Sequence, residues 1–244
     1  MDALATSALR LGDDSLILGQ RLGEWCGHAP ALEVDLSLAN VALDLIGQAT
    51  HFLGLAGELE GKGRDADALA FRRDVMDFTN CLLVEQKNGD FAQTVARQFL
   101  FSHYQELLFA ELAASKHERF AAIAAKAVKE VTYHAKLASD WVVRLGDGTE
   151  ESRARMIAGL DSMWRFADEL FVMDDVDGAL GLDKAALKLA WDQRVDAVLA
   201  DATLERPAAR RAITGGRAGH HSEQLGHLLT EMQFLQRAYP GATW

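Results

Sequence analysis

The sequence predicts an all-α protein, a bundle of long antiparallel helices with shorter accessory helices packed outside. Only three prolines interrupt its 244 residues, so long stretches run without a helix breaker. Apolar residues recur at steps of three and four, which is typical of one buried helix face. No strand-like alternation bounded by hairpin turns occurs. We expect one all-α, ferritin-like domain that spans residues 1–244.

The first two predicted helices carry the clearest periodicity. The first runs from about residue 6 to 26, and Gly27 and Pro30 end it. The second runs from Pro30 to about Leu59 and carries a heptad seam that only one polar residue, Gln48, interrupts. The seam consists of Val34, Leu38, Val41, Leu45, Gln48, Phe52, Leu55 and Leu59.

Six further helices are expected along the rest of the chain. Asp90 should cap the helix that starts at Phe91. Ser115 and Glu118 have the spacing of a capping box and should open a helix that ends at Gly146. The stretch from Leu204 to Gly219 is the most loop-like. The expected ranges are 65–84, 91–114, 115–146, 149–172, 183–201 and 220–238.

Charge and composition exclude several classes of function. The formal net charge of −11 argues against nucleic acid as a partner, because phosphate binding relies on a basic surface. No apolar run approaches the roughly 18 residues that a membrane span requires, and the N-terminus lacks the pattern of a signal peptide. Cys26 and Cys81 lack a Cys-x-x-Cys spacing, which favours a reduced, cytoplasmic protein.

The chain lacks the metal-binding signature of di-iron proteins with a ferritin-like bundle. Such bundles bind two irons through a Glu from each of two helices and a Glu-x-x-His from each of the other two. No Glu or Asp in this chain stands three residues before a His. At two histidines a Gln occupies that position: Gln48 before His51, and Gln224 before His227. A neutral amide poorly replaces the anionic oxygen that bridges two cations. We therefore expect no metal and no catalytic residue in this chain.

A set of polar residues is nevertheless expected to point inward. Asp44, Gln48 and His51 lie beside the seam of the second helix, and Glu130 and His134 lie in an otherwise apolar stripe of the 115–146 helix. We interpret them as a vestigial cluster, the remnant of a metal site. It is either a metal centre with altered ligands or, as we favour, a hydrogen-bonded network without metal.

Two weaker candidates lie near the C-terminus. His220, Glu223 and His227 recur at steps of three and four, which suits a metal site, although a hydrated, partner-facing helix surface is the favoured interpretation. The glycines of residues 215–219 precede a helix and have arginines nearby, so they suit either a phosphate site or, as we favour, a flexible hinge with solvated arginines. The arginines are Arg206, Arg210 and Arg211.

Several blocks of the sequence resemble one known family across nearly the whole chain. The blocks are Leu9–Asp14, Leu18–Arg21, Glu24–Pro30, Leu83–Gln86, Asn88–Gln93, Ala125–Glu130 with Tyr133 and His134, Trp141 with Arg144–Glu151, and the tail Glu231–Trp244. Together they resemble the C components of bacterial phenylacetyl-CoA epoxidase, a multicomponent di-iron monooxygenase.

The resemblance implies a non-catalytic structural subunit. In that family the C component pairs with the catalytic A component, which carries the di-iron centre and binds phenylacetyl-CoA. A reductase supplies electrons from NADPH, and the complex epoxidises the ring at the start of aerobic phenylacetate degradation. For this chain we expect the catalytic A component as the direct partner, and the reductase and other subunits through the complex.

The terminal residues are the expected partner contact. Tyr239 and Trp244 flank a short Pro-Gly-Ala-Thr segment, which should become ordered only if its aromatic residues dock on something. The surface on which they dock belongs either to a partner or to the chain itself. Two rival functions also stay open: a divergent metal-binding, ferritin-like oxygenase active by itself, which would use Glu130 and His134 with Asp44 and His51, and a self-assembling storage bundle.

Overall fold

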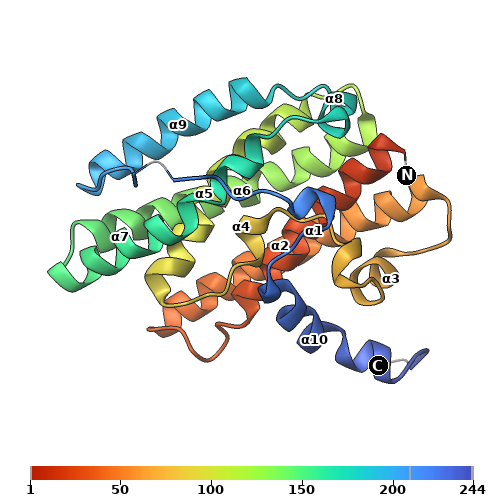
Figure 1. The fold of residues 1–244 in the computed structure, drawn as a ribbon, viewed down its shortest axis with the longest axis horizontal. Coiled ribbons are helices and arrows are strands. Elements are labelled where there is room, and N and C mark those ends of the chain that lie inside the picture. Colours follow the sequence, from red (N-terminus) through yellow and green to blue (C-terminus); the bar gives the residue numbers. More distant parts are fainter. Residues whose placement is uncertain (1, 209, 243–244) are drawn as a thin grey trace. The chain divides into compact units, whose positions relative to one another are not determined.

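The computed structural model describes residues 2–208 and 210–242. Their regular structure consists of ten α-helices and three short 3₁₀-helices, with no strand in these ranges, which confirms the all-α prediction; Figure 1 shows the helices in chain order. The chain divides into two compact units, one of residues 1–87 with 215–244 and one of residues 88–214. The single-domain organisation stays a prediction.

The first unit is built on two long helices, α1 (Ala3–Gly23) and α2 (Leu32–Glu60). They lie antiparallel, since Gly12 of α1 faces Leu53 of α2 while Gly19 faces Ala42. Along most of its length α1 is buried on every side. This unusual burial makes α1 the core element of the unit, although two aspartates stand in its middle.

The heptad seam predicted on α2 is largely confirmed. All its members are buried except Leu59, which is 39% exposed at the end of the helix. Gly61, in the left-handed conformation, ends the helix, as glycine commonly does at this position.

The single helix predicted over residues 65–84 is wrong. The structure has α3 (Ala66–Phe71), a 3₁₀ turn at Val75–Asp77 (η1) and α4 (Leu82–Glu85). Two backbone amides of this segment, those of Thr79 and Cys81, donate to aspartate side chains of α1. Because those amides are bonded elsewhere, they are not available for a continuous helical ladder. The last helix, α10 (Glu223–Ala238), completes this unit, and it starts three residues later than predicted.

The second unit contains the other two long helices, α5 (Phe91–Ala113) and α6 (Glu118–Gly146). Asp90 caps α5 as predicted, with Oδ1 accepting from the amide of Gln93 at 2.9 Å. The capping box predicted at Ser115 is wrong, because α6 begins at Glu118 and the Ser115 hydroxyl accepts from the amide of His117.

Shorter helices complete the second unit. The predicted helix over 149–172 ends early, as α7 (Glu150–Trp164), and a 3₁₀ turn at Ala167–Phe171 (η2) follows. Next come α8 (Asp175–Leu180), which the sequence did not predict, and α9 (Lys184–Asp201), close to its expected range. No helix among the described residues is long and apolar enough to cross a membrane.

A pair of glycines on α2 tests the packing of the first unit. A Cβ atom at Gly57 would lie 2.0 Å from the carbonyl oxygen of Arg64, whereas a Cβ atom at Gly54 would meet nothing within 4 Å. Gly57→Ala should therefore lower the free energy of unfolding by about 1–3 kcal/mol through overpacking. Gly54→Ala, the control, should raise it by about 0.5–1 kcal/mol, because alanine is the better helix former. Urea unfolding of both variants would measure this, and equal effects would contradict the packing described.

Candidate functional site

The α2 part of the vestigial cluster is only partly inward-facing. Gln48 is 3% exposed and belongs to the buried seam. Asp44 is half-buried, and His51 is exposed. The inward direction predicted for His51 is therefore wrong: the residue lies on the outer side of the helix.

The other part of the cluster lies on α6, in the second unit. His134 is completely buried and Glu130, one helical turn earlier, is half-buried. Whether these two residues converge with those of α2 stays a prediction. Within residues 2–208 and 210–242, no group of three or more His, Cys, Asp and Glu side chains could hold a metal ion.

The C-terminal histidines lie on a hydrated surface, as the favoured interpretation expected, and whether that surface faces a partner stays a prediction. His220 precedes α10, and His220, Glu223 and His227 lie toward the solvent. Arg206 and Arg210 are not simply solvated, because Arg206 forms ion pairs with Asp192 and Asp196 of α9 and Arg210 with Asp161 of α7; these contacts lie within the second unit. Both arginines are therefore already paired with carboxylates of the chain, which does not favour a phosphate site.

The structure also contains a buried charged network in the first unit that the sequence did not predict. Its aspartates lie in α1, its glutamate in α4, and its cations come from distant segments. The members of this network are Asp13, Asp14, Arg73, Glu85, Arg217 and His221.

The two aspartates of α1 are held by different arginines. Asp13, with no exposed surface, pairs with Arg73 and also accepts from the amide and hydroxyl of Thr79 at 2.8 and 3.0 Å. Asp14 accepts two bonds from Arg217, at 2.6 and 3.0 Å, and one from the amide of Cys81 at 2.7 Å. For both carboxylates, hydrogen bonds from a cation and from neutral donors thus offset the free-energy cost of removal from water.

Glu85 forms the other half of the network. Its carboxylate accepts from the His221 ring at 2.7 Å, from the amide of Ser222 at 2.7 Å and from the side-chain amide of Asn80 at 2.9 Å. The second ring nitrogen of His221 lies 2.8 Å from the carbonyl oxygen of Phe78. Since both ring nitrogens face acceptors, the doubly protonated imidazolium fits this position best.

The pKa of His221 reflects these contacts. Burial by itself would lower the pKa, but the bond to Glu85, the bond to the Phe78 carbonyl and the charges of Glu85 and Asp13 outweigh it, so that the pKa is raised above 6.5. The positive charge that the two acceptors favour on His221 is therefore held to a higher pH than in an exposed histidine.

The network leaves no carboxylate oxygen open for a metal. Each oxygen of Asp13, Asp14 and Glu85 accepts at least one hydrogen bond from a protein donor. The charged network therefore has a structural role: its hydrogen bonds hold α4 and the segment before α10 against α1. Two adjacent aspartates in an apolar helix were the available sequence signal, because buried charges need partners.

A second buried titratable group, His103, lies in the second unit. Its Nε2 atom on α5 is 2.9 Å from the Ser139 hydroxyl of α6. Burial and the nearby charge of Arg194 lower the pKa of His103 to about 4. The ring is neutral at pH 7 and connects the two longest helices of this unit by a hydrogen bond.

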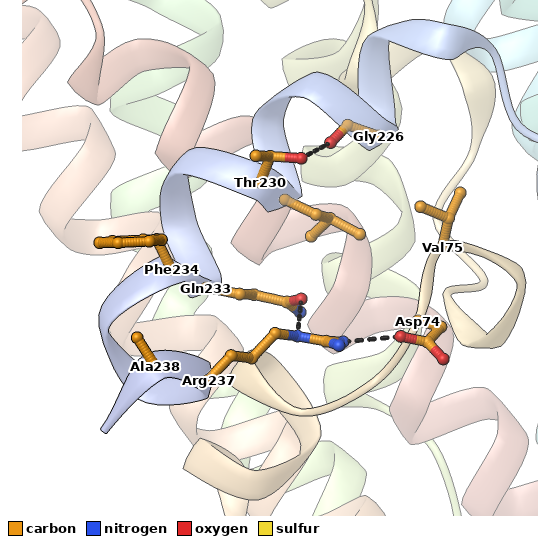
Figure 2. A pocket seen from close by; sticks show the side chains of 9 residues that line it. Asp74, Val75, Gly226, Thr230, Gln233, Phe234, Arg237 and Ala238 are labelled. Atoms are coloured by element: carbon orange, nitrogen blue, oxygen red, sulfur yellow. Dashed lines mark hydrogen bonds and ion pairs between the residues drawn. The ribbon is translucent and has the colours of Figure 1, made fainter. Parts of the chain in front are cut away.

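A groove of about 520 Å³ lies between α10 and the η1 segment. In Figure 2, Phe234 and Ala238 line one side, while Arg237 reaches Gln233 and Asp74. The groove is lined by Asp74, Val75, Gly226, Leu229, Thr230, Gln233, Phe234, Arg237 and Ala238. It combines an apolar wall with an ion pair that already satisfies its arginine, so it offers contact area rather than a charged binding site.

Comparison with known proteins identifies the family. The family model PaaA_PaaC, described as "Phenylacetic acid catabolic protein", matches residues 1–244. The chain belongs to this family. The ferritin-like helical fold predicted from the sequence is the fold of the family. The chain is also 49% identical, over 249 aligned residues that cover all of both proteins, to the C component of 1,2-phenylacetyl-CoA epoxidase of Escherichia coli (strain K12).

The His221–Glu85 pair gives a pH-dependent prediction. Because the folded pKa of His221 is raised above its ordinary value of 6.5, the stabilisation is complete below pH 6.5 and is lost as the pH rises through the folded pKa. His221→Gln should lower the free energy of unfolding by about 3 kcal/mol at pH 6, because it leaves a buried carboxylate without its cation.

The loss should become smaller as the pH rises. His220→Gln, at the exposed neighbouring position, is the control and should change stability by less than about 0.5 kcal/mol. Urea unfolding of both variants between pH 5.5 and 9 measures the effect. A loss that did not depend on pH would refute the charged state assigned to His221.

Proposed function

We propose that this protein is a non-catalytic structural subunit that pairs with the iron-bearing catalytic subunit of a phenylacetyl-CoA epoxidase. In this role it supports aerobic phenylacetate degradation in the cytoplasm, and the complex connects it to an NADPH-dependent reductase and the other subunits. The full-length identity of 49% to the C component of the E. coli epoxidase carries the proposal.

The chemistry of the chain supports a non-catalytic role. A di-iron centre needs four or more carboxylates with two paired histidines, yet no Glu-x-x-His occurs here and Gln48 stands three residues before His51. The buried carboxylates of the charged network are occupied by protein donors. The chain uses its buried acids to stabilise itself.

A division of labour between two related subunits has a physical reason. A subunit with an active site keeps polar groups and open space among its helices, which weakens its core. A relative with a filled core can support those helices by packing on their outer faces. Tyr239, 59% exposed at the end of α10, keeps its proposed role in the partner contact, whereas Trp244 lies outside the described residues.

One observation favours the rival function, a divergent metal-binding oxygenase. Glu130 and His134 lie one turn apart on α6, and both are at least half-buried. Residues four apart share a helix face and can bind one ion together. Their spacing of four residues differs by one from the usual three. The two functions predict different effects of replacing Glu130.

Metal analysis of the separated subunits distinguishes the two functions. After co-expression with the catalytic subunit and separation of the chains, we expect the iron to remain with the catalytic subunit. Glu130→Ala should leave the iron content and the epoxidation rate of the complex unchanged, as should the exposed control Glu118→Ala on the same helix. Roughly two irons per copy of this chain, lost together with activity in Glu130→Ala, would establish the rival.

A further inference from the structure

Three leucines on the outward side of α2 are exposed to water, where they alternate with the exposed polar residues Asn40, Thr50 and His51. Leu32, Leu36 and Leu43 are 71%, 57% and 69% exposed. They follow one another at steps of four and seven, and Gly47 and Gly54 continue the series at steps of four and seven. Such steps place all five residues on one side of a helix. We call these five residues the α2 outer face.

The packing of the chain itself does not explain these residues. The buried side of α2 already packs within the chain, with Ala42 and Leu53 against glycines of α1, and the three exposed leucines do not belong to it. A Cβ atom at Gly47 or Gly54 would meet nothing within 4 Å. Glycine inside a helix is less stable than alanine, and packing within the chain does not require glycine at these two positions. The two glycines do allow another backbone to approach closely.

The charge of α2 indicates whether a second copy of the chain or a different polypeptide binds the α2 outer face. The α2 helix contains neither lysine nor arginine, and its acidic residues are Glu33, Asp35, Asp44, Glu58 and Glu60. Glu60 is paired with Arg64 of the same chain, so the negative charge that another chain would meet comes from the other four. In a two-fold dimer the same patch meets itself, and the acidic rows of two copies of α2 would face each other at a cost. Charge complementarity therefore favours a different polypeptide whose apolar helix face is flanked by lysines or arginines.

We propose that the α2 outer face is the surface on which a helix of the epoxidase's catalytic subunit docks. This inference rests on the proposed function and adds its contact surface. Leu36 and Leu43 are the central apolar contacts. Gly47 and Gly54 are the points of closest approach between the helix axes, which pack roughly 8–10 Å apart depending on the side chains between them. Glu33 lies near the start of α2 and pairs with a basic residue of the partner.

Substitution of a central leucine tests the surface. Leu43→Glu places a charge at an exposed position, so the isolated chain should keep its melting temperature. Its affinity for the purified, iron-loaded catalytic subunit, measured by titration calorimetry, should fall at least tenfold. The matched control is Leu189→Glu, on α9, where the leucine is 62% exposed; this variant should bind like the wild type.

A glycine variant gives an independent readout. Gly47→Leu fills open space in the isolated chain, so its stability should stay the same or rise, because leucine is the better helix former. Binding to the catalytic subunit should nevertheless weaken at least tenfold. A residue with a purely internal role would not combine a stable chain with weaker association.

The outcomes separate the two levels of the proposal. If both variants bind the catalytic subunit like the wild type, the docking surface is wrong and the proposed function stands. If the wild-type chain does not bind the catalytic subunit, the proposed function fails and this inference fails with it. If the wild-type chain alone is a dimer that Leu43→Glu converts to a monomer, the occupant is a second copy and the assignment to the catalytic subunit is overturned.

Discussion

The first unit depends on the pairing of two buried carboxylates in the middle of α1. Burying an unpaired carboxylate costs several kcal/mol, so Asp13 and Asp14 can lie in the core only with their partners in place. Those partners are far away in sequence: Arg73 is 60 residues from Asp13 and Arg217 is 203 residues from Asp14. This requirement explains why residues 215–244 belong to the same compact unit as residues 1–87.

The same pairing explains which parts of the fold could be predicted from the sequence. The seam of α2 and the cap of α5 follow from residues within or next to one helix, and both were found. The region after residue 65 was predicted as one helix because its composition is helical. In the structure Thr79 and Cys81 donate instead to the aspartates of α1. A local pattern does not reveal a partner more than 60 residues away, so the break in this helix was missed.

The candidate site shows the same distinction between local and distant signals. The missing Glu-x-x-His is a local fact and was visible in the sequence. The direction of His51 was not, because a residue at the edge of a helix stripe turns inward or outward according to what packs beside it. His221, whose neighbour His220 is exposed, is held inward by contacts with Glu85 and Phe78. No local pattern distinguishes these two histidines.

The interior and the surface of this protein therefore carry different parts of its function. The buried acids of the charged network are paired with cations of the same chain, while the leucines of the α2 outer face are exposed and are the proposed contact with a partner. The most direct test is anomalous diffraction at the iron edge from crystals of the complex with the catalytic subunit. The account predicts iron peaks only within the catalytic subunit, with one of its helices against Leu36 and Leu43. An iron peak beside Glu130 and His134 of this chain would contradict it.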